Sequence, residues 1–242
     1  MGHGRPSWDK YRSYGSLYEE VEAGELAVRL GSPVTFDRRG RVLWYDTFER
    51  GLGAWVLAEV GAGSVPHLTT ETCRTTGVAV KIEPGAFVGD ISRMSHFQPY
   101  PALGKFGNEL SFSLADSYCK LHLQMYVYTG SQFLRAEARY DRPAQKLEYR
   151  DSAGAWQTLA SGLLIYPEIT LFHTLKLVVD FATQKYSRLI FNASSYLLSS
   201  YAIAVAASAV EPQMITRITG EIASVGAGVI YVDDVIITQN EP

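Results

Sequence analysis

The amino-acid sequence predicts an all-β protein, an antiparallel two-sheet jelly-roll sandwich preceded by an extended or partly helical N-terminal arm. Two observations carry this prediction. From residue 41 onward, short runs rich in Val, Ile, Tyr, Phe and Leu are separated by Gly, Pro, Asn or Asp turns at the spacing typical of a sandwich. Hydrophobic residues make up 47% of the 242 residues and charged residues 19%, so the chain can bury one large core.

The first forty residues differ from the rest of the chain, with several tyrosines, an acidic cluster and the turn FDRRG. Ser16 and Glu19 have capping-box spacing and Gly31 suits a C-cap, so a short helix is predicted between them. An arm of this kind buries too little surface alone to offset its conformational entropy, so we expect it to lie on a neighbouring subunit. The predicted organisation is an arm over residues 1–40 and a sandwich over residues 41–242.

Strand-like runs follow one another from residue 41 to the C-terminus. The predicted strands lie near 41–48, 54–60, 65–72, 77–82, 86–98, 106–114, 119–129, 132–141, 145–150, 155–159, 171–181, 185–191, 213–222 and 228–238. No internal repeat of the length used by propellers or solenoids is present, so one sandwich is favoured over a repeat architecture.

The clearest alternation lies between residues 119 and 150 and predicts a three-strand meander with turns at Thr129-Gly130 and Arg142-Pro143. The apolar face is the predicted core side and carries Leu121, Leu123, Met125, Val127, Leu134, Ala136, Ala138, Tyr140, Leu147 and Tyr149. On the other face, the predicted cross-strand pairs are Tyr126–Arg135, Gln124–Glu137, His122–Arg139, Asp141–Lys146, Arg139–Glu148 and Glu137–Arg150.

Composition excludes several partners. The net charge of -3 and the scattered basic residues leave no footprint for nucleic acid. No apolar run reaches the length of about 18 residues that a membrane span needs. The N-terminus lacks the apolar core of a secretory signal, so we expect synthesis in the cytoplasm, or an extracellular mature form whose signal has been removed.

Cys73 and Cys119 are too few for a disulfide scaffold, and free thiols are favoured over a disulfide.

No catalytic motif is present in the sequence. Glu137 and Asp141 share a strand face, but basic residues lie between and opposite them, which favours a salt-bridged surface over a catalytic pair. The five histidines show no H-E-x-x-H spacing, G-x-S-x-G is absent, and no Walker loop occurs. The sequence therefore predicts that the protein is not an enzyme.

One polar and aromatic patch remains as a candidate ligand or interface site, on the outward face of the first hairpin of the meander. It comprises His122, Gln124, Tyr126, Tyr128, Phe133 and Arg135. Aromatic rings beside amide and charged groups are typical of sugar sites. They are also typical of subunit interfaces, and the sequence leaves both readings open.

The runs WYDTFERGLGAW, at residues 44–55, and YVDDVII, at residues 231–237, resemble the first and last strands of concanavalin A-like jelly rolls. This superfamily includes lectins, laminin-G-like domains, carbohydrate-binding modules and glucanases, and the E-x-D-x-E motif of its glucanases is absent here. The resemblance implies that the first and last strands lie together.

That arrangement would bring four acids close to one another, at a place where several carbohydrate-binding relatives hold a structural calcium ion. The predicted metal ligands are Asp46, Glu49, Asp233 and Asp234. Clustered carboxylates and turn carbonyls could supply the six to eight oxygen ligands that calcium needs. Asp233 and Asp234 are equally well explained by one acid that points to solvent and one that accepts a hydrogen bond from loop backbone. No other cofactor is implied.

The whole chain also resembles phage-associated jelly-roll proteins. Together with the arm, this predicts a non-enzymatic structural or assembly protein, a virion decoration or capsid-associated subunit at the particle surface. Its predicted partners are further copies of itself, bound through the arm, and a capsid or particle protein. The alternative prediction is a carbohydrate-binding or adhesion module with glycan partners.

Overall fold

The computed structural model describes residues 39–75 and 77–242, and it confirms the predicted all-β class. Within these residues every regular element is a strand, every strand pair is antiparallel, and no helix is long and apolar enough to cross a membrane. The predicted arm lies outside the described residues except for Arg39 and Gly40, so the division at residue 40 stays a prediction.

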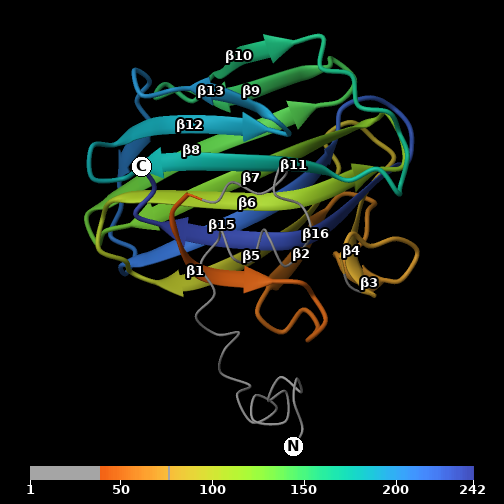
Figure 1. Cartoon of the computed structure of the whole chain (residues 1–242), viewed down its shortest axis with the longest axis horizontal. Coiled ribbons are helices and arrows are strands. Elements are labelled where there is room, and N and C mark those ends of the chain that lie inside the picture. The colour runs from red at the N-terminus through yellow and green to blue at the C-terminus, as the bar shows by residue number, and fades with distance from the viewer. Residues whose placement is uncertain (1–38, 76) are drawn as a thin grey trace, which may run out of the picture.

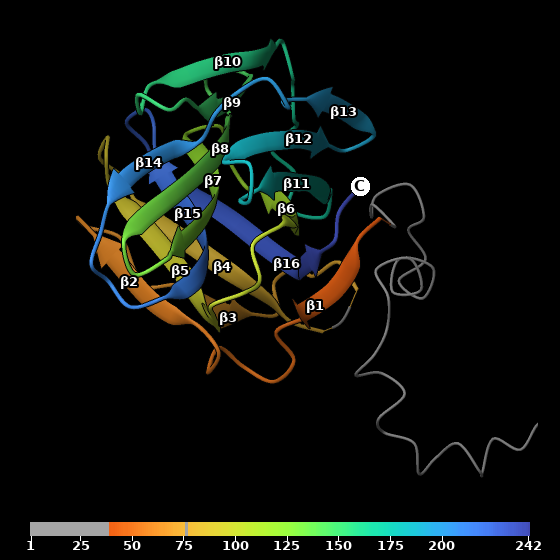
Figure 2. The same cartoon turned by 90° about the vertical axis from the view of Figure 1, so that its left-hand side faces the viewer.

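The described strands form two sheets that pack face to face (Figures 1 and 2). Sheet 1 has the order β13 (Ser194–Leu197), β12 (Lys185–Phe191), β11 (His173–Asp180), β6 (Lys105–Leu114), β16 (Gly228–Gln239), β4 (Ala79–Gly85) and β3 (His67–Thr69), with β1 (Arg41–Asp46) also paired to β16. Sheet 2 has the order β10 (Trp156–Ser161), β9 (Lys146–Arg150), β8 (Gln132–Asp141), β7 (Cys119–Tyr128), β15 (Gln213–Ile222), β5 (Ile91–Pro99) and β2 (Val56–Val60), with β14 (Ala204–Ala207) also paired to β8.

Two strands were not predicted from the sequence, β13 and β14. Their sequences, SSYL and AVAA, lack the bulky alternation that marks the other strands, and each is held by one partner strand, β12 and β8 respectively. The turn before β13 is Asn192-Ala193, with Asn192 at φ 51°, which agrees with the turn expected from an asparagine there.

One apolar core fills the space between the sheets. The predicted core face of the meander is confirmed, because every residue assigned to it is buried in this core. Sheet 1 contributes the facing layer, which includes Phe106, Leu110, Phe112, Leu175, Leu177, Val179 and Phe181. Each fully buried side chain of this size contributes about 1.5–3 kcal/mol. Both cysteines are free thiols, and Cys119 lies in the core.

The predicted register of the meander is also confirmed. Tyr126 lies opposite Arg135, Gln124 opposite Glu137 and His122 opposite Arg139. In the second hairpin, Arg139 and Asp141 of β8 lie opposite their predicted partners on β9. A slip by one residue would have turned the apolar set toward solvent, so the alternating pattern and the turn positions fix the pairing.

The first and last strands lie side by side, as the resemblance implied (Figure 1). β16 pairs with β4 through residues 228–232 and with β1 through residues 235–239. Between these two parts the register shifts at Asp233, and Asp234 has a φ of 50°. This irregularity lets one strand serve two partners on the same side of the sheet.

Candidate functional site

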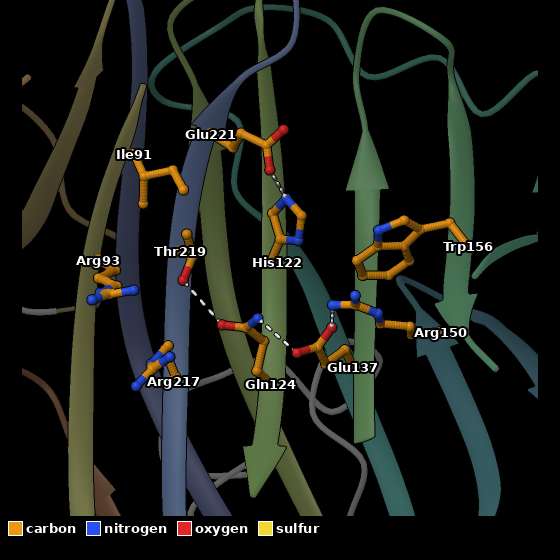
Figure 3. A pocket seen from close by; sticks show the side chains of 10 residues that line it. All are labelled: Ile91, Arg93, His122, Gln124, Glu137, Arg150, Trp156, Arg217, Thr219 and Glu221. Atoms are coloured by element: carbon orange, nitrogen blue, oxygen red, sulfur yellow. Dashed lines mark hydrogen bonds and ion pairs between the residues drawn. The ribbon is translucent and has the colours of Figure 1, made fainter. Parts of the chain in front are cut away.

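A depression of about 170 Å³ lies on the outward face of sheet 2, away from the core (Figure 3). It is lined by Ile91 and Arg93 of β5, Arg217, Thr219 and Glu221 of β15, His122 and Gln124 of β7, Glu137 of β8, Arg150 of β9 and Trp156 of β10. Because side chains alternate along a strand, these residues stand on the face opposite the core residues of the same strands. Six neighbouring strands therefore contribute to one site.

Glu137 is the buried anion of this site, with 2% of its surface exposed. Its Oε1 accepts hydrogen bonds from the Tyr126 hydroxyl at 2.7 Å and from Gln124 Nε2 at 3.2 Å. Its Oε2 accepts a hydrogen bond from Arg150 Nη1 at 2.7 Å. Burial raises the pKa of Glu137, but the hydrogen bonds from Tyr126 and Arg150 outweigh it and leave the pKa below its ordinary value. Glu137 is therefore ionised at neutral pH.

Tyr186, a buried residue of sheet 1, binds the backbone of Glu137 and of Arg150. Beyond the last pair of the β8–β9 ladder, the Tyr186 hydroxyl donates to the Arg150 carbonyl at 2.6 Å and accepts from the Glu137 amide at 3.0 Å. The hydroxyl thus stands between two backbone groups that would otherwise continue the ladder. Tyr186 is 1% exposed, so its hydroxyl is a buried partner of both backbone groups.

Two further polar contacts order the floor of the depression. Gln124 Oε1 accepts a hydrogen bond from the Thr219 hydroxyl at 3.1 Å, which fixes the orientation of the amide. His122 Nε2 lies 3.1 Å from Glu221 Oε2. The hydrogen bond from His122 lowers the pKa of Glu221 below its ordinary value, although burial opposes the shift. Glu221 therefore carries its charge at neutral pH as a partner of His122.

Trp156 forms the aromatic rim of the site. It lies on β10, the edge strand of sheet 2, and its ring is inclined by 72° to the His122 ring, with the two centroids 5.4 Å apart. The Arg139 guanidinium lies 4.0 Å from the centroid of the indole ring, and Arg139 Nε in turn donates to Glu148 Oε2 at 2.6 Å. These contacts hold the indole in one place beside the polar floor.

The two arginines on the opposite side of the depression have a different environment. Arg93 and Arg217 come from the adjacent strands β5 and β15. Arg217 Nε donates to Ser95 Oγ at 2.9 Å, and its guanidinium lies 5.1 Å from the centroid of the Tyr126 ring. Among the described residues, no carboxylate oxygen lies within 4.0 Å of either guanidinium.

The residues of the predicted patch fall in two places. His122 and Gln124 line the depression, and Tyr126 lies beneath it with 6% of its surface exposed. Tyr128 and Phe133 stack on each other at 4.6 Å near the β7–β8 turn. The remaining residue, Arg135, borders a second hollow that Phe133 and β14 also line. The predicted outward face is thus observed, but the six residues do not share one surface.

The ion pair predicted for Glu137 is confirmed, but among the described residues Asp141 forms its ion pair with Lys120 and not with the predicted Lys146, and neither carboxylate is exposed. Glu137 is bound by Arg150, and Lys120 Nζ lies 3.5 Å from Asp141 Oδ2. Both carboxylates are buried, with 2% of Glu137 and 7% of Asp141 exposed. Burial makes the Glu137 pair a structural element of the site rather than a solvated surface contact.

The sequence did not predict Arg93, Arg217, Thr219, Glu221 or Trp156 as site residues. Their strands show the alternation expected of half-buried strands. Their position beside the meander depends on the order β9-β8-β7-β15-β5, in which β15 inserts between strands far earlier in the chain. No local signal in the sequence gives that order.

The four predicted calcium ligands lie near the β1–β16 seam, and protein donors bind each of them. Asp46 accepts hydrogen bonds from the Phe48 amide at 2.7 Å and from Trp55 Nε1 at 2.9 Å. Glu49 accepts a hydrogen bond from the Gly77 amide at 2.8 Å. Asp46 therefore holds the loop between β1 and β2, and Glu49 joins that loop to the segment between β3 and β4.

The two aspartates of β16 face an arginine. Asp233 accepts backbone hydrogen bonds from Arg74 and Asp234, both at 2.8 Å. Asp234 accepts the Thr75 hydroxyl at 2.7 Å and lies 3.6 Å from Arg74 Nη1. Burial, with the nearby charge of Asp233, raises the pKa of Asp234 to about 7.

This donor set does not fit a calcium shell, because its carboxylates accept protein hydrogen bonds and Arg74 supplies the positive charge beside Asp234. In the part of the chain that the structure describes, no group of three or more His, Cys, Asp or Glu side chains is arranged to hold a metal ion. Calcium at the seam stays a prediction, and the geometry weighs against it.

Comparisons with known proteins identify the fold. No protein-family model and no curated protein sequence matches the chain. A carbohydrate esterase from the Shiga toxin-encoding bacteriophage phi24B superposes with a TM-score of 0.54 at 13% identity, covering 84% of this chain and 100% of that chain. The carbohydrate recognition domain of Emp46p, in its potassium-bound form, gives a TM-score of 0.52 at 11% identity, covering 80% of this chain and 92% of that chain.

A sialidase is also similar in structure, with a TM-score of 0.51 at 12% identity. The match covers 86% of this chain but spans only 19% of the length of the sialidase. At these identities the likeness shows a shared jelly-roll fold, which supports at the level of fold the resemblance seen in the first and last strands. It does not transfer an activity.

These neighbours correct one prediction. The prediction that the chain is not an enzyme is wrong as an exclusion, because a carbohydrate esterase and a sialidase have domains of this fold. It rested on missing linear motifs, and a site assembled from several strands leaves no such motif. The names of these neighbours refer to carbohydrate chemistry or recognition in those proteins, and what they share with this chain is the fold.

Proposed function

We propose that the protein binds carbohydrate in the depression on sheet 2. The observation that carries this proposal is the placement of the fixed Trp156 ring beside an ordered polar floor that includes Gln124 and Glu137. Sugar sites combine an aromatic surface, which packs on the apolar face of a ring, with oriented groups that bind hydroxyls. The carbohydrate-related neighbours of the same fold support this reading.

The test is binding of the full-length protein to a glycan array, followed by titration calorimetry with the glycans that bind. Trp156→Ala should weaken binding at least tenfold, equivalent to about 1.4 kcal/mol, because the variant loses the aromatic surface and keeps the polar floor. Leu197→Ala is the control, since it removes an exposed apolar side chain, 80% exposed, from an edge strand of sheet 1.

The glycans that bind are then followed over time for soluble products, because the neighbours of this fold include enzymes. Products that appear with the unmodified protein and not with Trp156→Ala would show turnover at the same site. Binding that Trp156→Ala leaves intact would refute the assignment of the site, as would the absence of binding and of products across the array.

The more specific prediction of a virion or capsid-associated subunit, assembled through residues 1–40, is retained as a proposal. Light scattering after size-exclusion chromatography, on the full chain and on a chain lacking those residues, tests it. We expect an oligomer that the deletion dissociates, because the arm gains stability only against another subunit. Two monomers at high concentration would refute it.

A further inference from the structure

We propose that the depression selects acidic saccharides, with Arg93 and Arg217 binding a carboxylate or sulfate group of the sugar. This inference rests on the proposed carbohydrate site and adds the chemical class of its ligand.

The charges of the depression do not balance within the protein. Three guanidiniums line it, against the two carboxylates of Glu137 and Glu221. Both carboxylates already have partners, since Arg150 binds Glu137 and His122 binds Glu221. Among the described residues, no carboxylate oxygen lies within 4.0 Å of the other two guanidiniums, those of Arg93 and Arg217.

Other arginines of the molecule show the contrast. Arg139 is bound to Glu148, Arg150 to Glu137 and Arg188 to Glu241. In the part of the chain that the structure describes, no such carboxylate pairs with Arg93 or Arg217, although both are only half exposed. A half-buried guanidinium that is not neutralised by the protein favours an external anion, and its planar donors suit the geometry of a carboxylate or sulfate.

The sheet register places the two guanidiniums on the same face as a pair. Arg93 lies opposite Thr219, and Arg217 lies opposite Ser95, so the two arginines occupy diagonal positions on adjacent antiparallel strands. Diagonal neighbours of this kind stand about 7–8 Å apart, which lets two long side chains converge on one anionic group. The Ser95 hydrogen bond and the Tyr126 ring hold the Arg217 side chain in place.

The depression therefore has two chemically different ends. Figure 3 shows Arg93 and Arg217 on one side, Trp156 on the other, and the polar side chains of Gln124 and Glu137 between them. An acidic sugar residue can place its charged group at the arginine end and its ring toward the indole. A neutral sugar would leave the two arginines without an anion, which makes the site selective.

The test uses the full-length protein with polygalacturonate, alginate and hyaluronate, each compared with its carboxyl-reduced neutral form, and with dextran sulfate compared with dextran. Binding is measured by calorimetry at two salt concentrations. We expect each acidic polymer that binds to do so at least tenfold more tightly than its neutral form. Comparing the affinities of the three uronate polymers with that of dextran sulfate shows whether the site binds a carboxylate or a sulfate.

The variants are Arg93→Gln, Arg217→Gln and the double variant, with Arg50→Gln as the control for loss of one exposed positive charge. The double variant should bind the acidic polymer at least tenfold more weakly, lose most of the salt dependence, and bind the neutral form unchanged. Arg217→Lys should recover only part of the affinity, because an ammonium group lacks the paired donors. Thermal melting confirms that each variant is folded.

The outcomes separate the two proposals. Equal binding of acidic and neutral forms, lost in Trp156→Ala, would overturn acidic selection and leave carbohydrate binding standing. If Arg50→Gln weakens binding as much as Arg217→Gln does, general charge attraction replaces the specific site. The same follows if polyglutamate, an acidic polymer that is not a saccharide, binds as tightly as the acidic saccharides. Binding of none of the polymers would overturn acidic selection, and carbohydrate binding would then depend on the array result.

Discussion

Replacement of Glu137 by Gln tests the buried charge at the centre of the site. The substitution keeps the shape of the side chain, and the amide oxygen can still accept the Tyr126 hydroxyl at the Oε1 position. It leaves Arg150 Nη1 facing an NH₂ group at the position where Oε2 now accepts its hydrogen bond at 2.7 Å. The guanidinium then loses its only carboxylate within the cluster.

The magnitude follows from how buried each partner is. Removing one partner of a fully buried pair costs about 3–5 kcal/mol. The Glu137 side chain is 2% exposed, but that of Arg150 is 30% exposed and keeps part of its hydration. We therefore expect a loss of about 2–3 kcal/mol, which corresponds to a fall in melting temperature of about 4–12 °C for a chain of this size.

The loss of stability in the Glu137→Gln variant should depend on pH. The pKa of Glu137 lies below its ordinary value in the folded protein, so its ionised form contributes stability above the pKa of the unfolded state. That contribution disappears as the pH falls through the folded pKa. The difference in stability between the protein and the Glu137→Gln variant should be largest near pH 7 and shrink below about pH 4.

Urea denaturation at pH 7 and at about pH 3 measures the difference. Glu59→Gln is the control, since Glu59 is an exposed residue of the edge strand β2. The control should change stability by less than about 0.5 kcal/mol. A Glu137→Gln variant as stable as the control variant at pH 7 would refute the argument that the buried pair holds the floor of the site.

Three further predictions concern the structure around the site and the seam. Tyr186→Phe should lower stability by about 1–3 kcal/mol in urea denaturation, because the Arg150 carbonyl and the Glu137 amide lose a buried partner; an unchanged midpoint would contradict this. The folded pKa of Asp234 is raised to about 7, so ionisation of this carboxyl destabilises the folded protein as the pH rises from about 4 to 7. Over that range the free energy of unfolding should fall relative to that of Asp234→Asn. Parallel curves of unfolding free energy against pH for the two proteins would show that the carboxyl is not perturbed. Addition of EGTA should leave the melting temperature unchanged, because Arg74 supplies the cation beside Asp234, and a fall on chelation, restored by calcium, would show that the seam holds the metal.

The meander shows what local pattern can determine. The alternation of apolar and polar residues between residues 119 and 150 predicted the core face, and the turns predicted the pairing of β7 with β8 and of β8 with β9. These features depend on the two-residue period of a strand and on turn residues, both of which are properties of short segments. His122 and Gln124 were placed in the site on the same basis.

The rest of the site depends on contacts between distant segments. Arg93 and Arg217 line the same depression because β15 inserts between β7 and β5, and Trp156 reaches the rim because β10 adds to the outside of β9. Likewise, the burial of Tyr126 and Glu137 follows from neighbouring strands and not from their own alternation. The strand order is selected by the packing of the whole core, which no single segment encodes.

The sequence alone therefore determined the class of fold, the core face of its clearest strands and the neighbouring positions of the first and last strands. Each of these follows from periodicity, turn chemistry or resemblance within short runs of residues. Only the tertiary structure decided which outward-facing side chains share a depression. It also decided which guanidiniums there have no carboxylate partner among the described residues. A charge is neutralised by whatever lies within a few ångströms of it, and that distance is set by the folded chain.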